Sequence, residues 1–166
     1  TALGGTPSTS NPAFWENGSI NWLSSGEISS FPIVSAQQKI THEALEKSTT
    51  SLWHQGSVLI SITRYIRPTI LGIDSCANQS VVGVQESRQL KKSYLYPYFV
   101  SKVPHYLSLR TGNQQPHINK ETIDSSWILV PPDNILSKYY DTAKPIYDLI
   151  LNNARQTQEL KQLRDW

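Results

Sequence analysis

Residues 4–15, GGTPSTSNPAFW, together with residues 20–28, INWLSSGEI, decide how this 166-residue sequence is interpreted. Nine of the first twelve residues are Gly, Pro, Ser, Thr or Asn, which favour turns and local bonds between side chains and backbone. That composition is typical of a linker, but the run ends in Phe14 and Trp15, and residues 19–24 alternate like a short strand. We therefore expect an ordered surface segment that the two aromatic side chains anchor to a domain.

Outward from this stretch, short strand-like and helix-like patterns follow one another along the chain. Compact β-branched runs predict strands, and apolar residues at intervals of three and four predict helices. The expected strands cover residues 57–62, 69–74, 78–84 and 127–130, and the expected helices cover residues 41–48, 94–109 and 120–125, with Pro104 bending or ending the second helix. The sequence thus predicts an α+β fold: a compact mixed domain over residues 1–132, with a twisted β-sheet and short helices, followed by a long C-terminal helix.

Residues 133–166 form the second predicted unit, a truncated spacer helix with Asp133 as its expected cap and a kink at Pro145. Beyond this proline, residues repeat at heptad a and d positions, with polar residues in the middle pair. The apolar members of that seam are Ile146, Leu149, Leu160 and Leu163. A helix with so polar a seam is marginal alone, so we expect these residues to contact a partner helix. A homodimer through this helix would also cover them.

Composition limits the class of protein. Hydrophobic residues make up 38% of the chain and charged residues 17%, which is typical of a folded domain. Cys76 is the single cysteine, so an internal disulfide and a cysteine-based zinc cluster are excluded, and no apolar run approaches the length of a membrane span. We expect a cytoplasmic protein. The chain begins with Thr1 and contains no Met, which indicates a fragment of a longer protein.

Basic residues concentrate in the middle third of the chain. Lys and Arg outnumber Asp and Glu by eight to two over residues 61–120, whereas the acidic residues are in excess on either side. A localised positive face favours a polyanionic partner such as nucleic acid.

Motifs of catalysis are missing from the sequence. It contains no Gly-rich phosphate loop, no His-Glu-x-x-His and no Gly-x-Ser-x-Gly, and the four histidines are not spaced as metal ligands.

Polar donors are instead abundant in three loops, TRYIRP (63–68), ESRQLKKS (86–93) and LSLRTGNQQPHIN (107–119). The candidate DNA-binding residues in these loops are Arg64, Tyr65, Arg67, Arg88, Lys91, Lys92, Arg110, Asn113, Gln114, Gln115 and His117. We predict no catalytic residue, no metal site and no cofactor.

The side-chain types suggest a division of labour among these loops. Arg reads guanine through two hydrogen bonds, Asn and Gln read adenine, and Lys mainly contacts phosphate. Base contacts are therefore expected from Arg64, Arg67, Arg110 and residues 113–115, and phosphate contacts from Arg88, Lys91 and Lys92. Composition leaves other classes open: a stand-alone RNA-binding module, a nuclease, and a purely structural adaptor that interacts through its helix.

The order of several short motifs resembles the target recognition domain of type I restriction-modification specificity subunits. The matching residues are Gly4 to Thr9, Asn11-Pro12, Phe14-Trp15, Ile20 to Trp22, Ser25 to Ile28, Ile40-Thr41, Gly56 to Ser61, Asn78-Gln79, Leu95 to Phe99, Gly112, Gln114-Gln115, Ile118-Asn119, Ile123 and Pro131-Pro132, with QELKQLRDW at residues 158–166 similar to the start of the spacer helix. One feature departs from the family. Its members often carry a Gly-rich turn after the strand at residues 56–61, whereas residues 63–68 contain two arginines and no glycine. This loop is a candidate for what distinguishes the protein's target.

The resemblance implies a non-catalytic module that binds one half of a split sequence in double-stranded DNA, mainly through loops at a groove. It implies methylation subunits as partners, which bind S-adenosylmethionine and methylate adenine, and a motor and nuclease subunit that translocates and cuts DNA. It also implies that spacer helices pair as a coiled coil and hold the methylation subunits. A complete specificity subunit carries two such domains and two such helices, so the chain is expected to be one domain with part of one helix.

Overall fold

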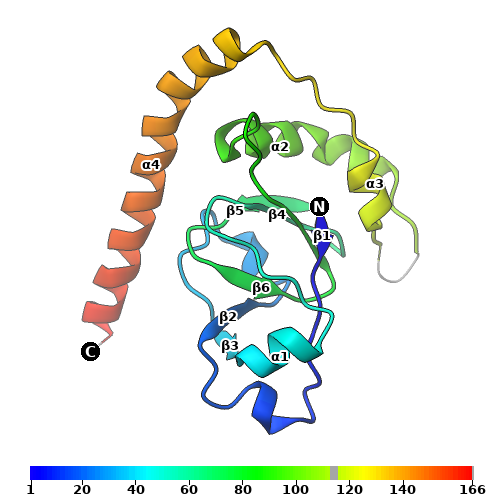
Figure 1. Ribbon diagram of the computed structural model, residues 1–166, viewed down its shortest axis with the longest axis vertical. Coiled ribbons are helices and arrows are strands. Elements are labelled where there is room, and N and C mark those ends of the chain that lie inside the picture. Colours follow the sequence, from blue (N-terminus) through cyan, green and yellow to red (C-terminus); the bar gives the residue numbers. More distant parts are fainter. Residues whose placement is uncertain (113–115, 166) are drawn as a thin grey trace.

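The structure is a computed structural model that describes residues 1–112 and 116–165. In chain order its elements are β1 (Ala2–Leu3), η1 (Pro12–Phe14), β2 (Ile20–Leu23), η2 (Glu27–Ser29), β3 (Gln38–Ile40), α1 (His42–Lys47), β4 (Val58–Ser61), β5 (Arg67–Ile70), β6 (Ser75–Ala77), β7 (Val81–Val84), α2 (Lys92–Ser108), α3 (Lys120–Asp124) and α4 (Asp133–Arg164). Figure 1 shows α2 over one sheet, a second sheet below it, and α4 running along one side of the molecule. The predicted α+β class with a long C-terminal helix is confirmed.

A four-stranded antiparallel sheet in the order β1-β7-β4-β5 lies under α2. All four residues of β4 are buried. Val58 and Ile60 pack into the cluster beneath α2, whereas Leu59 packs into the cluster on the other face of the sheet. Because both faces of β4 are covered, its sequence is a continuous apolar run rather than an alternating one.

A second sheet, in the order β3-β2-β6, contains two strands that the sequence pattern did not predict. β2 pairs antiparallel with β3 and parallel with β6. Trp53, 1% exposed, belongs to the core cluster between the sheets, and a Cβ on Gly83 would lie 2.2 Å from its indole ring. Glycine at position 83 therefore lets the large ring lie directly against β7.

The segment GGTPSTSNPAFW is folded, as expected. The amides of Gly4 and Gly5 donate to the carbonyl oxygens of Val81 and Ala77, both at 2.9 Å. Phe14 is buried, and the ring of Trp15 packs edge-on against Trp22 at 5.1 Å between centroids. These contacts attach the segment to both sheets, so it is not a linker.

Helix α2 continues through both of its prolines to Ser108. The helix therefore does not end at Pro104, which was one of the two expected effects of this proline. A proline cannot donate to the carbonyl four residues earlier. For Pro97 that carbonyl belongs to Ser93, and it accepts a hydrogen bond from the Tyr139 hydroxyl of α4 at 2.6 Å. The missing helix bond is thus replaced by a bond that ties α2 to α4.

The expected strand at residues 127–130 is also wrong, because the structure has no strand there. The segment runs beside α2, where the hydroxyls of Tyr94 and Tyr98 donate to the carbonyl oxygens of Leu129 and Trp127 at 2.9 and 2.7 Å. Trp127 is 92% exposed, so its apolar character does not reflect core packing. Side chains of α2 supply hydrogen bonds that a neighbouring strand would otherwise supply.

Helix α4 begins at Asp133 with Pro132 as its cap residue, so Asp133 is the first helical residue rather than the cap that was expected. The helix remains one element past Pro145. Its buried residues are Leu136, Ala143 and Leu151. The division of the chain at residue 132 stays a prediction, since α4 packs against α2 along part of its length.

Candidate nucleic-acid interface

Two of the three donor-rich loops meet at one end of the four-stranded sheet. β4 ends at Ser61, and the chain returns as β5 from Arg67, which makes β5 start two residues earlier than the sequence pattern predicts. The amide of Arg64 donates to the carbonyl oxygen of Pro116 at 2.8 Å, and the amide of Ile118 donates to that of Ile62 at 3.0 Å. These bonds join the β4–β5 loop and the segment after α2 into one unit.

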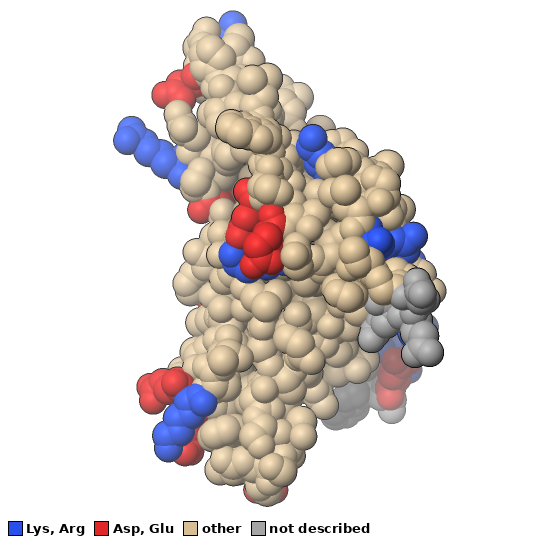
Figure 2. All heavy atoms as spheres, turned by 90° about the vertical axis from the view of Figure 1, so that its right-hand side faces the viewer, with Lys and Arg blue, Asp and Glu red and all other residues tan. Residues whose placement is uncertain are grey.

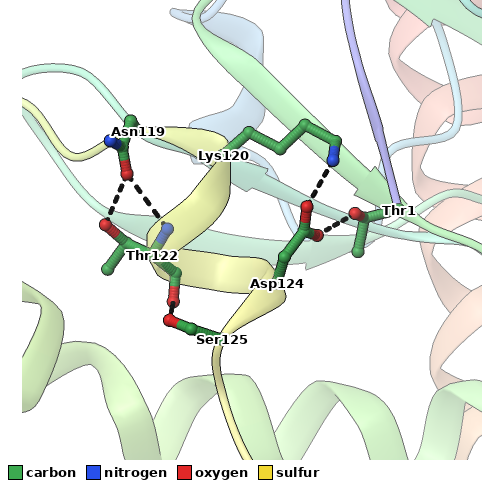
Figure 3. A network of polar contacts seen from close by, with 6 residues as sticks. All are labelled: Thr1, Asn119, Lys120, Thr122, Asp124 and Ser125. Atoms are coloured by element: carbon green, nitrogen blue, oxygen red, sulfur yellow. Dashed lines mark hydrogen bonds and ion pairs between the residues drawn. The ribbon is translucent and has the colours of Figure 1, made fainter.

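The segment after α2 is closed by a pair of backbone bonds. Thr111 and His117 each donate an amide to the other's carbonyl oxygen, at 2.9 and 3.0 Å. α3 starts directly afterwards, where the Asn119 side chain accepts from the amide and hydroxyl of Thr122 at 3.0 and 2.7 Å (Figure 3). The exit of this loop is therefore fixed by a capped helix.

The far end of α3 is held by a carboxylate. Asp124 accepts from the Lys120 ammonium and from the Thr1 hydroxyl, as Figure 3 shows. The bond from Lys120, together with that from Thr1, lowers the pKa of Asp124, so the carboxylate is charged at neutral pH. The short helix is thus joined to the chain segment that leads into β1.

Three of the predicted DNA-binding residues, Arg64, Tyr65 and Arg67, project from the β4–β5 loop and are exposed. The Arg67 guanidinium lies 4.9 Å from the centroid of the Tyr65 ring, a cation–π contact that orients it. Arg64 has φ +62°, in the left-handed region that is rare for non-glycine residues. Such backbone conformations cluster at functional sites.

Arg110 and His117 lie in the adjoining segment, and both are exposed. The Arg110 Nε donates to the Leu107 carbonyl oxygen at 3.2 Å, which leaves the terminal guanidinium nitrogens at the surface. The predicted residues Asn113, Gln114 and Gln115 lie outside the described residues. The structure therefore brings together five of the predicted residues: Arg64, Tyr65, Arg67, Arg110 and His117.

The third loop lies at the opposite end of the same sheet. In the β4–β7 pairing Ser61 opposes Val81 and Val58 opposes Val84, so the chain leaves β7 at the end remote from the β4–β5 loop. The loop carries the remaining predicted residues Arg88, Lys91 and Lys92. The excess of basic residues in the middle of the sequence is therefore divided between two ends of a sheet.

Bonds to α4 and within the loop itself also restrict this third loop: the Lys91 amide donates to the Tyr140 hydroxyl of α4 at 3.1 Å. The Lys91 ammonium donates to the Ser87 carbonyl oxygen at 2.9 Å, and the Lys92 amide donates to Glu86 Oε1 at 2.6 Å. Both lysines are half-buried, whereas Arg88 is exposed. Among the described residues on the face in Figure 2, Lys and Arg side chains occur singly or beside Asp and Glu.

The turn after β2 is a part of this end of the molecule that the sequence did not assign to the interface. Ser25, Gly26 and Ser29 line one cavity together with Arg64 and Arg67. The sequence did contain a signal for this ordered turn, because Ser24 and Glu27 are three residues apart. At this spacing a glutamate accepts a hydrogen bond from the amide of a capping residue, as Glu27 does from Ser24.

Helix α4 exposes to solvent the four residues that were predicted to contact a partner helix. Ile146, Leu149, Leu160 and Leu163 are 54%, 60%, 66% and 73% exposed. A different face of the helix docks on the domain: Leu151 is buried there, and Arg155 Nη2 donates to the Gly72 carbonyl oxygen at 2.9 Å. The four apolar side chains thus form an uncovered stripe.

Other chemistry is limited in this structure. Burial raises the pKa of the Cys76 thiol to about 11, so it carries no reactive thiolate at neutral pH. In residues 1–112 and 116–165, no cluster of three or more His, Cys, Asp or Glu is arranged to hold a metal ion. None of the helices in this described part is both long and apolar enough to cross a bilayer.

Comparison with known proteins supplies the family. Residues 2–162 match the model of the type I restriction modification DNA specificity domain. The chain is 30% identical over 138 residues to the EcoR124I/EcoR124II specificity subunit of Escherichia coli, covering 79% of this chain and 34% of that protein. It is 33% identical over 54 residues to the MjaIX specificity subunit of Methanocaldococcus jannaschii, covering 32% and 12%.

Solved structures share the fold. The HsdS subunit from Thermoanaerobacter tengcongensis gives a TM-score of 0.58 at 18% identity, over 97% of this chain and 39% of that one. A chain from a structural study of type I R-M system assembly gives 0.59 at 16% identity, over 97% and 40%. The chain therefore spans about a third of the E. coli relative and about two fifths of these solved chains. With its family model matched along nearly the whole sequence, the chain belongs to the type I restriction-modification DNA specificity domain family.

Proposed function

We propose that this chain recognises one half of a split target in double-stranded DNA, as part of the specificity subunit of a type I restriction-modification complex. The family match over residues 2–162 carries the proposal, and the joined donor-rich loops at one end of the sheet support it. In such a complex the chain directs adenine methylation and restriction and is not itself catalytic. Separate methylation subunits and a motor and nuclease subunit supply the catalysis.

The recognition unit is proposed to be residues 1–132, with base contacts from the segment that carries Arg110 and His117. A guanidinium that reads guanine contributes about 1–3 kcal/mol of discrimination at one base pair. Arg110→Ala should therefore weaken binding to duplexes of one sequence class. Equal loss on every duplex would instead assign Arg110 to a phosphate.

Arg88, Lys91 and Lys92 remain proposed phosphate contacts at the other end of the sheet. Each phosphate contact adds about 0.9 to the slope of log affinity against log salt. Lys91→Ala with Lys92→Ala should weaken all duplexes alike and flatten that slope by at most about two units. Because the Lys91 ammonium already donates to Ser87, Lys92→Ala alone should change the slope more than Lys91→Ala alone.

The exposed stripe on α4 is proposed to pair with another helix, which holds the methylation subunits in the complex. Self-association through the same stripe is the expected behaviour of the chain by itself. Leu149→Glu with Leu160→Glu should abolish it in sedimentation, while the domain stays folded because both side chains are more than half exposed. A wild-type chain that stays monomeric at high concentration with α4 helical would contradict a self-pairing seam.

The decisive experiment is methylome mapping of adenine sites in the host, with and without the intact gene. Loss of methylation at one split motif is the expected result. Competition between duplex DNA and single-stranded RNA for the chain tests the stand-alone RNA-binding alternative, since preference for RNA would overturn the proposal.

A further inference from the structure

A cavity of about 310 Å³ opens between the turn after β2 and the β4–β5 loop. Hydroxyl and guanidinium groups make up most of its polar wall, and none of the residues that line it is acidic. Its lining consists of Ser25, Gly26, Ile28, Ser29, Ser61, Thr63, Arg64, Tyr65 and Arg67. A cavity with this polar wall is suited to an anion.

The Ser29 and Ser61 hydroxyls of this cavity donate to the carbonyl oxygens of Gly26 and Thr63, at 2.9 and 3.4 Å, but four other donor groups have no acceptor among residues 1–112 and 116–165. Within the described residues, the guanidinium groups of Arg64 and Arg67 make no hydrogen bond and no ion pair. The hydroxyls of Ser25 and Thr63 donate to no acceptor in this part of the protein. The contact with Tyr65 covers one flat face of the Arg67 guanidinium, and its N–H edges stay available. Two forked cations and two hydroxyls are thus left to bind a group from outside.

Glu27, which lies between the lining residues Gly26 and Ile28 in the sequence, accepts hydrogen bonds mainly from the backbone. Glu27 Oε2 accepts from the amide and hydroxyl of Ser24 at 2.8 and 2.9 Å, and its Oε1 accepts from the amide of Gln37 at 2.9 Å. The carboxylate therefore shapes the turn, and its lone pairs are occupied by donors rather than aimed at an anion. Glu27 is a positioning residue for this wall.

We propose that the cavity binds a phosphate of the DNA backbone, with Arg64 and Arg67 as its cationic ligands and Ser25 and Thr63 as further donors. This inference rests on the proposed function and reassigns the two arginines from base reading to phosphate binding. Both arginines line one cavity together with hydroxyl donors, and the several acceptor oxygens of one phosphate can use all of these groups, which supports the reassignment. Such a contact fixes the register of the domain on the duplex and carries no sequence information.

Gly26 offers a sharp test. Its φ of −67° suits any residue, and a Cβ there would meet only Ser24 Oγ, at 3.8 Å. Gly26→Asp therefore adds a negative charge at the rim without a clash, and Gly26→Asn adds nearly the same shape without charge. Binding to duplexes of unrelated sequence is followed by fluorescence anisotropy at several salt concentrations. Binding of inorganic phosphate is followed by NMR shifts at the cavity.

The expected result is about fivefold weaker binding of Gly26→Asp to every duplex, from a like-charge interaction of about 1 kcal/mol, with Gly26→Asn within about twofold of wild type. The deficit should shrink as salt rises. Inorganic phosphate should shift the cavity resonances of wild type and Gly26→Asn and not those of Gly26→Asp.

Each other outcome overturns a separate statement. Equal duplex binding by the two variants would overturn the phosphate assignment and leave the proposed function standing. A loss confined to one sequence would return the arginines to base reading. If the wild-type chain bound phosphate here and no duplex, the proposed function would fail and the cavity would be a site for free phosphate.

Discussion

Arg64→Gly should stabilise the protein while removing a proposed DNA contact. The φ of +62° at Arg64 costs a non-glycine residue about 1–2 kcal/mol, whereas the greater freedom of glycine in the unfolded chain costs about 0.5–1 kcal/mol. Within the described residues, the Arg64 side chain makes no hydrogen bond or ion pair that its removal would break. The free energy of unfolding should therefore rise by about 0.5 kcal/mol in Arg64→Gly and stay nearly unchanged in Arg64→Ala.

Urea denaturation of the two variants measures this difference, which corresponds to about 1–2 °C in melting temperature for a chain of this size. Both variants delete the same guanidinium, so they should lose the same duplex affinity. Asn17→Gly is the matched control: Asn17 has φ +56°, at the far end of β2 from the 25–29 turn, so DNA affinity should not change. An alanine variant more stable than the glycine variant would refute the reasoning, as would duplex binding that fails in glycine alone.

Two further predictions concern the region where α4 docks. Gly72→Ala should cost about 2 kcal/mol, because the new Cβ would lie 2.9 Å from the Ile33 carbonyl oxygen as well as 2.5 Å from Leu151 Cδ1; an unchanged urea midpoint would contradict the close packing of Ile33 and Leu151 on Gly72. Bonds from His54 and from the amide of Gln55 lower the pKa of Asp74, so its carboxylate adds stability above about pH 4 that is lost as pH falls. The side chain is 56% exposed, so Asp74→Asn should cost at most about 1 kcal/mol at pH 7, and its unfolding curve should approach that of wild type near pH 3.

Elements with a complete local signal could be predicted from the sequence. β4 is a buried apolar run, and α1 begins where the Thr41 hydroxyl accepts from the Ala44 amide. Three strands escaped prediction: β1 has two residues, β3 and β6 have three each, and all are defined by their neighbours rather than by their own pattern. Residues 127–130 failed for the converse reason, since their apolar pattern is strand-like but tyrosine hydroxyls of α2 take the place of a partner strand.

The candidate site, like the fold, could be predicted only in part from the sequence. Donor-rich loops are visible in the sequence, and five of the predicted residues do meet at one end of the sheet. What the sequence could not provide is the β4–β7 register, which sends the loop with Lys91 and Lys92 to the other end. Nor could composition reveal that the turn after β2 completes a cavity, because its serine hydroxyls form a polar site only where the fold places them beside Arg64 and Arg67.

The same short strand links the cavity to the helix. β5 starts at Arg67 in the cavity wall and ends at Ile70, two residues before Gly72, whose carbonyl oxygen accepts from Arg155 of α4. The opposite wall is connected to the same place, since Ile33 follows the 25–29 turn in the chain. The Ile33 amide donates to the Ile70 carbonyl oxygen at 2.9 Å, and the Ile33 carbonyl oxygen accepts from the Gly72 amide at 2.7 Å. Both walls of the cavity thus converge on the residue that receives α4. Rotation of α4 about this point would break the bond from Arg155 to Gly72 and expose Leu151, so α4 is held to the domain at the residue on which both walls converge.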